Sequence, residues 1–449
     1  MFLLILSCSN PDNHIKDTET IATTQQRLGD PEQGLWYLLY GDYIGSGIPK
    51  EVYDNYFGPS SYNPLERTGE AETIPYAFNL FNAPNGVEVV GGINCFGCHS
   101  NTINGEFYIG IGNAFSDYTS DDSAAYVILS NQISNTYGID SPEWEAYKNL
   151  GEASVQIGPN IVTPFAGINP AFALEEAATQ YRDPESLERQ AEAQFELGAG
   201  LASDTPPWWH IQKKDSLYYN GLGRDDMVKL IMQICIVGVW DVEHAEEIES
   251  HFPDVLAYLM TLNPPVFPEP IDSALANQGE ELFLANCAHC HGTYGESETY
   301  PNRLIPVEDV GTDARLARSY IQDTGFLDWL QNSWFANSSH PAQFVAEEAY
   351  IAPPLDGIWV TAPYLHNGSI PNLYTLLDST TRPMYWTRDF TSSAYDLNQV
   401  GWPFTEQSSP INEYTYNTNK IGYGNQGHTY GDHLNSAERK AIIEYLKTL

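Results

Sequence analysis

Two five-residue stretches, residues 95–99 and 287–291, both read Cys-x-x-Cys-His. Two thiols one helical turn apart can add to the two vinyl groups of a haem, and the following histidine places an imidazole under the iron. We therefore predict two covalently bound haem c groups (Fe). The predicted thioether residues are Cys95, Cys98, Cys287 and Cys290, and the predicted iron ligands are His99 and His291.

A zinc site with four cysteine ligands is the alternative use of these thiols. It leaves the histidine after each cysteine pair unexplained, and the two pairs lie far apart in the sequence. The repeated motif therefore favours haem attachment.

The two remaining cysteines lie in apolar surroundings. Cys235 falls within the apolar run 230–239, which predicts a buried thiol. Cys8 follows the apolar run 1–7 and resembles a lipoprotein cleavage site, so we predict lipidation at Cys8, although the run is short for a signal segment and a misplaced start or chance is the alternative. No later segment approaches ~18 consecutive apolar residues, so we expect a lipid anchor and no membrane span.

The charge balance restricts the partners. The chain has 20 Lys and Arg against 59 Asp and Glu, a formal net charge of −39. This disfavours nucleic acid and anionic lipid surfaces and favours a cationic or neutral partner, unless the charge serves only to keep the surface solvated. The expected partners are a redox protein or a small electron donor.

These motifs need elements that position them, and the pattern predicts a mainly α fold with two cytochrome c-like haem domains and long loop-rich insertions. Four prolines within residues 263–270 mark the boundary. The expected division is a signal remnant at 1–8, a flexible tether at 9–31, an N-terminal haem c domain at 32–262, the linker at 263–270 and a C-terminal cytochrome c domain at 271–449.

Helical patterns occupy most of the first domain, at about 122–137, 142–151, 170–180, 183–199, 225–237, 242–250 and from 253 onward. The glutamate pairs at 175–176 and 246–247 are predicted to lie on solvated helix faces. In the second domain, Asp272 is the predicted N-cap of a first helix, and Asn435 with Glu438 predicts a capping box on the last one. Gly279 and Tyr445 fit the close crossing of these two helices.

Beyond the haem motifs, several stretches resemble one family. They are residues 94–99, 206–209 (Pro-Pro-Trp-Trp), 279–292, 352–359, 362–369 (Ala-Pro-Tyr-Leu-His-Asn-Gly-Ser) and 427–428. Together they resemble the RoxA-like di-haem c-type cytochromes, which include rubber oxygenases and are distantly similar to bacterial di-haem cytochrome c peroxidases and MauG. The chain is shorter than the rubber oxygenases, so their polymer channel is not expected to carry over.

The resemblance implies that the second haem takes a late histidine as its sixth ligand. His428 matches in context, because it sits in the glycine-rich stretch 422–431 just before the final helix. The rival ligands are His433, His366 and Met384. A haem with two strong protein ligands transfers electrons.

The first haem has no comparable ligand, although His210, Met227 and Met232 could reach it. We therefore expect an open sixth site there that can bind O2 or peroxide. The resemblance places Trp208 and Trp209 near this haem, as distal-pocket or electron-transfer residues or as core packing. Trp209 and His210 are the candidate catalytic residues. Arg224 is a candidate partner for a haem propionate, with a surface ion pair as the alternative.

These observations predict an exported di-haem c-type cytochrome of the periplasm or outer membrane of a Gram-negative bacterium. Its second haem is the expected electron-transfer site, and its first is the candidate site for O2, peroxide or a hydrophobic substrate. An oxygenase or peroxidase is favoured, and a pure electron carrier is the alternative.

Overall fold

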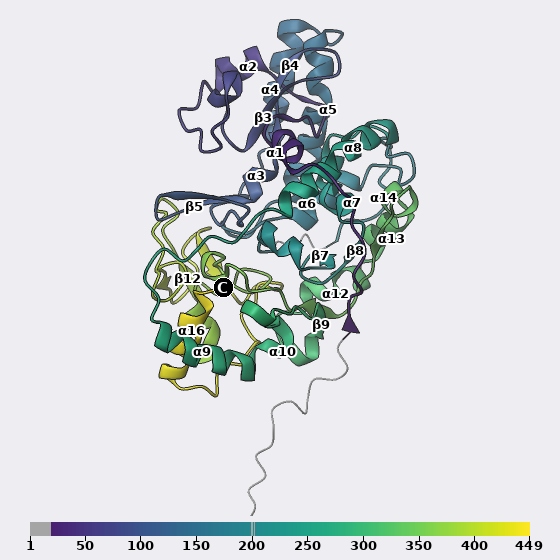
Figure 1. Cartoon of the computed structure of the whole chain (residues 1–449). Helices are drawn as coiled ribbons and strands as arrows, with labels where there is room; N and C mark the ends of the chain where they lie inside the picture. Colours follow the sequence, from purple (N-terminus) through teal and green to yellow (C-terminus); the bar gives the residue numbers. More distant parts are fainter. Residues whose placement is uncertain (1–18, 199–200, 202) are drawn as a thin grey trace, which may run out of the picture.

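The computed structural model describes residues 19–198, 201 and 203–449 (Figure 1). Helices account for 39% of these residues and strands for 14%, so the prediction of a mainly α fold is wrong and the chain is mixed α/β. The strands are two to six residues long. Strands this short carry too little alternation of polar and apolar residues to be recognised in a sequence.

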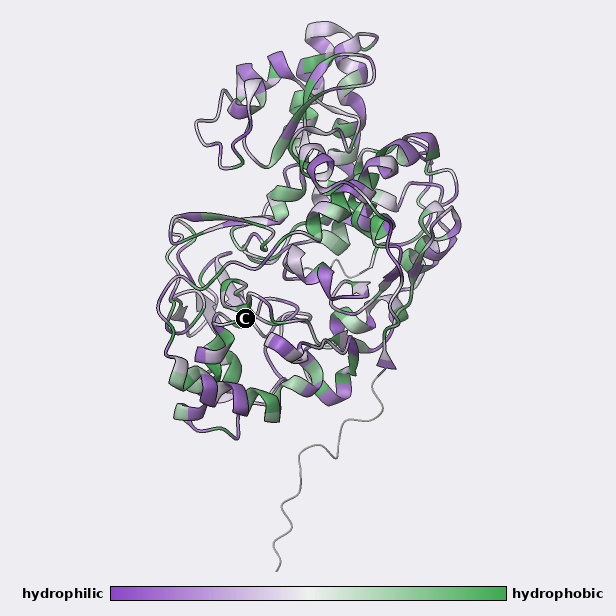
Figure 2. Ribbon diagram, in the orientation of Figure 1, coloured by the Kyte–Doolittle hydropathy of each residue, from purple (hydrophilic) through white to green (hydrophobic). Residues whose placement is uncertain are grey.

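The helices of the first half of the chain include α3, which carries the first Cys-x-x-Cys-His stretch. They are α1 (Pro31–Tyr40), α2 (Lys50–Tyr56), α3 (Cys95–Cys98), α4 (Ser123–Tyr137), α5 (Pro142–Ile157), α6 (Ala171–Thr179), α7 (Met227–Ile231) and α8 (Val242–Leu259). Figure 2 shows hydrophobic residues gathered where α6 and α7 lie near the centre of the molecule.

The helices of the second half begin after the proline-rich stretch. They are α9 (Ser273–Asn286), α10 (Ala288–His291), α11 (Val307–Val310), α12 (Arg315–Gln322), α13 (Gly325–Asn332), α14 (Trp334–Asn337), α15 (Leu373–Leu377) and α16 (Ser436–Leu446).

The strands of the described chain form small antiparallel sheets. In spatial order these are β2 (Gly47–Pro49), β4 (Glu88–Ile93) and β3 (Phe78–Asn82); β5 (Ser100–Ile103) and β6 (Glu106–Ile109); β10 (Ala342–Phe344), β8 (Gly223–Asp225) and β7 (Ser216–Leu217); β1 (Glu19–Thr20), β9 (Arg303–Pro306) and β11 (Ala349–Ile351); and β13 (Thr405–Glu406), β12 (Tyr385–Thr387) and β14 (Thr415–Asn417). Two of these sheets join segments from both sides of residues 263–270, because β1 pairs with β9 and β8 pairs with β10.

The first and last helices of the C-terminal region cross closely, as predicted (α9 and α16 in Figure 1). The Asp272 side chain caps α9, and Asn435 with Glu438 forms the predicted capping box of α16. A Cβ atom on Gly279 would lie 1.9 Å from the Ala441 carbonyl oxygen and 2.9 Å from Tyr445 Cβ. Only glycine permits this approach, which confirms the roles predicted for Gly279 and Tyr445.

Four predicted helices differ from the structure. Residues 183–199 contain no helix where they are described, because Pro184 interrupts the chain and the Arg182 guanidinium holds the Leu187 carbonyl in a turn. The predicted helix over 225–237 divides into α7 and a 3-10 helix, η5 (Gln233–Val237). The two helices predicted around Pro253 are one continuous helix, α8, with the proline inside it.

The tether predicted at 9–31 is only partly described, and its described part is ordered against the body. Residues 19–20 form β1, and Arg27 makes ion pairs of 2.7 Å with Asp226 and with Glu249. Glu249 also pairs with the buried Lys229 at 2.6 Å. These charges hold the segment around Arg27 against α7 and α8, within the range for which the sequence predicted a flexible tether.

The glutamate pair on α6 is buried, whereas the pair at 246–247 on α8 is exposed as predicted. The Tyr218 hydroxyl lies 2.7 Å from the Gln233 side-chain oxygen and 3.4 Å from both Glu175 carboxyl oxygens. The Tyr218 hydroxyl therefore donates mainly to Gln233 and more weakly to Glu175. Burial raises the pKa of Glu175 to about 8, although the hydrogen bond from Tyr218 opposes this shift. The prediction of a solvated face failed because the tertiary partners of α6 supply polar groups.

This raised pKa predicts a pH-dependent stability. The folded chain holds the Glu175 proton between pH 4.5 and about 8 while the unfolded chain releases it, so stability falls as the pH rises through this window. We expect Glu175→Gln to remove on the order of 2 kcal/mol of this loss, measured by urea unfolding at pH 5 and pH 8.5. The matched control is Glu246→Gln on the exposed face of α8. Equal losses in both variants would contradict the protonated state.

Candidate functional site

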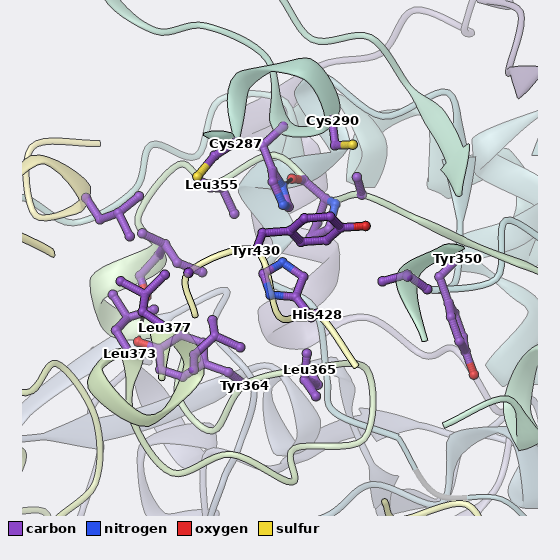
Figure 3. A pocket seen from close by; sticks show the side chains of 18 of the residues that line it. Cys287, Cys290, Tyr350, Leu355, Tyr364, Leu365, Leu373, Leu377, His428 and Tyr430 are labelled. Atoms are coloured by element: carbon purple, nitrogen blue, oxygen red, sulfur yellow. Dashed lines mark hydrogen bonds between the residues drawn. The ribbon is translucent and has the colours of Figure 1, made fainter. Parts of the chain in front are cut away.

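The second Cys-x-x-Cys-His stretch lines a cavity of about 420 Å³. Helix α9 leads directly into it: Cys287 is the C-cap of α9, and the one-turn helix α10 carries Cys290 and His291. Figure 3 shows both thiols at the edge of the cavity, with the His428 imidazole inside it. The close packing of α9 on α16 therefore fixes where these thiols lie.

The His291 imidazole is oriented by one backbone hydrogen bond. Its Nδ1 lies 2.8 Å from the Pro353 carbonyl oxygen. A carbonyl only accepts, so Nδ1 carries the hydrogen and Nε2 keeps its lone pair for a metal. Burial lowers the pKa of His291, which keeps the ring neutral, as an iron ligand must be.

His428 lies across the cavity from His291, with ring centroids 6.2 Å apart. Its loop is held by the backbone, since His428 N–H donates to the Val310 carbonyl at 2.8 Å. The Arg382 guanidinium also donates to the His428 carbonyl at 3.0 Å. Burial lowers the pKa of His428 to about 3, with His291 and Arg382 adding to the effect. The cavity therefore receives two neutral imidazoles from opposite sides.

The lining of the cavity fits a covalently bound haem with two histidine ligands. A volume of about 420 Å³ lies within the ~300–1,000 Å³ typical of cofactor sites. The wall near His428 is rich in apolar side chains, including Leu355, Leu365, Leu373 and Leu377, and the ring of Tyr430 also borders it (Figure 3). Such a wall suits the flat apolar face of a porphyrin.

The rival ligands lie less suitably than His428. Met384 is 53% exposed, and His433 is exposed at the edge of the cavity. His366 lines the cavity but stacks on Tyr350 with ring centroids 4.2 Å apart, and its Nε2 lies 3.2 Å from the tyrosine hydroxyl. His289 within the motif is exposed and contacts Arg303, as expected for a spacer residue.

The first Cys-x-x-Cys-His stretch is a turn in which Phe96 and Gly97 are buried and the two thiols and His99 are half-buried. The Asn94 side chain accepts from Gly97 N and caps α3, which carries Cys95 and Cys98. Burial raises the pKa of both thiols and lowers the pKa of His99 to about 4. The His99 ring stacks on Trp208 with centroids 5.0 Å apart and planes inclined by 25°. His99 is therefore a neutral imidazole in contact with a large aromatic ring.

A short segment connects the two motifs. Trp208 packs against His99, while its neighbours Pro206 and Pro207 line the cavity of the second motif. Trp209 packs in the second core and donates to the Asp356 carbonyl at 2.7 Å. His210 also lines the second cavity, with its Nε2 3.1 Å from the same carbonyl.

Other predicted site residues lie apart from these groups. Met227, Met232 and Cys235 are buried in the large hydrophobic core, Cys235 as predicted. Arg224 lies on β8 and pairs with Glu347 and Glu19, in keeping with the surface-pair alternative, and it is not among the residues lining the cavity. Cys8 lies outside the described residues.

Two functional contacts were not found from the sequence. The Pro353 carbonyl that orients His291 is a main-chain group, so its residue type carries no signal. Lys214 lines the cavity, but in the sequence it is one half of a lysine pair with Lys213. Only the tertiary structure separates the two, since Lys213 pairs with Glu298 and Asp356.

All four motif cysteines are described, and no three His, Cys, Asp or Glu side chains of the described chain converge to hold a metal ion. This arrangement does not support the zinc alternative.

No helix in the described part of the chain is long and apolar enough to cross a membrane.

The cavity wall coincides with a match to a known family. A family model described as RoxA-like, cytochrome c-like matches residues 349–387. This range includes the Pro353 carbonyl that orients His291, together with Leu355, Tyr364, Leu373 and Leu377 of the wall. The match and the geometry together support a haem cytochrome role for the RoxA-like region.

Two proteins of Sinorhizobium fredii (strain NBRC 101917 / NGR234) are similar to the chain. The uncharacterized protein y4iM is 28% identical over 295 residues, which cover 55% of this chain and 64% of that protein. The uncharacterized protein y4iJ is 28% identical over 253 residues, which cover 42% of this chain and 41% of that protein. The chain thus spans less than two thirds of the length of either relative.

Proposed function

We propose that this chain is an exported di-haem c-type cytochrome whose second haem, at residues 287–291, transfers electrons. The carrying observation is the pair of neutral imidazoles, His291 and His428, that face one cavity with Cys287 and Cys290 on its wall. When bound there, haem iron supplies one-electron exchange. The RoxA-like match to the cavity wall supports this assignment.

The residues of the chain prepare this site in defined ways. The Pro353 carbonyl holds the His291 tautomer, and Arg382 with the Val310 carbonyl holds the loop of His428. The leucines of the wall would exclude water from a bound haem. Because hydrogen bonds fix the His291 ring and the loop of His428, such a site would need little reorganisation when an electron passes.

We assign the first haem, at residues 95–99, as the site that reacts with O2 or peroxide. Of the residues considered as its sixth ligand, His210 lines the other cavity and bonds to a backbone carbonyl, and Met227 and Met232 pack in the core. Trp208 contacts His99, and its neighbours border the second cavity, which supports passage of electrons through this segment. Lipidation at Cys8, a hydrophobic substrate and a periplasmic or outer-membrane location remain part of this proposal.

The test is spectroscopy of the full chain matured in a bacterial host that attaches haem c. We expect two haems per chain by pyridine haemochrome that stay bound on acid-acetone extraction. Electron paramagnetic resonance should show one low-spin bis-histidine haem, and reduced protein should bind one CO per chain. Colourless protein would refute the assignment. Two low-spin haems that bind no CO would contradict a reactive site and identify a pure electron carrier. Turnover of peroxide with a reduced donor would identify a peroxidase.

A further inference from the structure

Lys214 lines the cavity of the second motif and is only 8% exposed. Its backbone N–H donates to the His210 carbonyl at 3.1 Å, so it follows directly on the 3-10 helix η4 (Trp208–Gln212). Within the described chain, its ammonium group has neither an ion pair nor a hydrogen bond. A buried ammonium without a partner is costly, so this position calls for an anion.

The neighbouring charges do not supply that anion. Asp204 is the one Asp or Glu among the described residues that line the cavity, and its carboxylate accepts from the Tyr219 hydroxyl at 3.1 Å rather than pairing with Lys214. Lys213 shows the contrast, because its ammonium pairs with Glu298 at 2.5 Å and with Asp356 at 2.7 Å. The chain thus provides carboxylates for one lysine of the pair and leaves the other facing the cavity.

Lys214 is also the one Lys or Arg among the described residues of the cavity wall. A haem bound at Cys287 and Cys290 would bring two propionate carboxylates into this space. We propose that the Lys214 ammonium binds a haem propionate in this cavity, in the role that the sequence had suggested for Arg224. The inference rests on the proposed haem site at residues 287–291.

The effect of burial on the pKa of Lys214 also supports this assignment. Desolvation lowers the pKa of Lys214 to about 8, so the charged form is less stable in the cavity than in water. A carboxylate beside the ammonium would oppose this shift. The positive charge of Lys214 would then offset the negative charge of the propionate. Because reduced haem carries one positive charge less than oxidised haem, this favours the reduced state.

The test is the reduction potential of the low-spin haem in Lys214→Met and Lys214→Gln, two neutral variants of similar length. Loss of one positive charge at an effective dielectric near 20 is expected to change the oxidised-to-reduced ratio at fixed potential roughly tenfold. For a one-electron couple this is a shift of about 59 mV to lower potential. Lys214→Arg keeps the charge and should restore the potential. Lys213→Met, next to it on the chain, is the matched control and should leave the potential unchanged.

The haem content separates this inference from the one it rests on. If wild-type protein carries no covalent haem at residues 287–291, the proposed function fails. If haem is attached normally and both neutral variants keep the wild-type potential, the propionate assignment is overturned while the haem site stands. If Lys214→Arg lowers the reduction potential as much as the neutral variants do, the shift does not depend on charge. It would then arise from packing alone, and the propionate assignment would again be overturned.

Discussion

Replacing Cys287 and Cys290 together by alanine is expected to halve the covalent haem of the chain, from two groups to one. The two thiols line the cavity at one edge, with Cys287 at the start of α10 and Cys290 one turn later within it, as thioether formation requires. Without them the cavity keeps its imidazoles and apolar wall but has no covalent attachment. The remaining haem should be the one at residues 95–99.

The measurement is pyridine haemochrome per chain, with haem staining on a denaturing gel. Cys235→Ala is the matched control, since Cys235 is also buried but lies in the hydrophobic core, and it should keep both haems. Cys95→Ala with Cys98→Ala should leave the complementary haem, with the low-spin signal intact. Two covalent haems in the Cys287 and Cys290 double variant would rule out this attachment site.

The sequence predicted single helix boundaries better than it predicted the architecture, whose mainly α class was wrong. Spacing alone identifies both motifs, and capping residues locate α9 and α16 because caps depend on neighbouring residues. Gly279 and Tyr445 could be paired because helix crossing leaves a simple pattern. Features that depend on a few neighbouring residues can therefore be predicted from the sequence.

The predictions that failed depend on residues that are far apart in the sequence. The burial of Glu175 depends on Tyr218 and Gln233, which are remote in sequence, and the placement of the segment around Arg27 likewise depends on Asp226 and Glu249. The small sheets pair strands from distant parts of the chain. No local pattern records such partners, which is why a mixed α/β chain reads as helices joined by loops.

Lys214 belongs to the same group. Its sequence context resembles that of Lys213, yet one lysine meets two carboxylates and the other faces the cavity. The difference arises from where η4 ends, because the chain direction after Gln212 decides which side chain points inward. The residue type shows that both side chains carry an ammonium group. Only the fold shows which of the two faces the cavity.

Replacing His428 by alanine is expected to convert the second haem from six-coordinate low-spin to a form that binds CO. The His428 imidazole faces His291 at 6.2 Å between ring centroids, and its removal leaves His291 as the axial ligand while the apolar wall remains. Haem content should stay at two per chain because both thiols remain. The CO bound per reduced chain should therefore rise from one to two.

Two further histidines that line the same cavity provide matched controls for this prediction. His433→Ala removes the exposed histidine five residues along the chain, and His366→Ala removes the ring stacked on Tyr350. Both variants should keep the low-spin spectrum and one CO per chain. If the low-spin signal survives in His428→Ala but is lost in one of these two, that histidine is the ligand. The loop held by Arg382 and the Val310 carbonyl would then serve only to close the cavity.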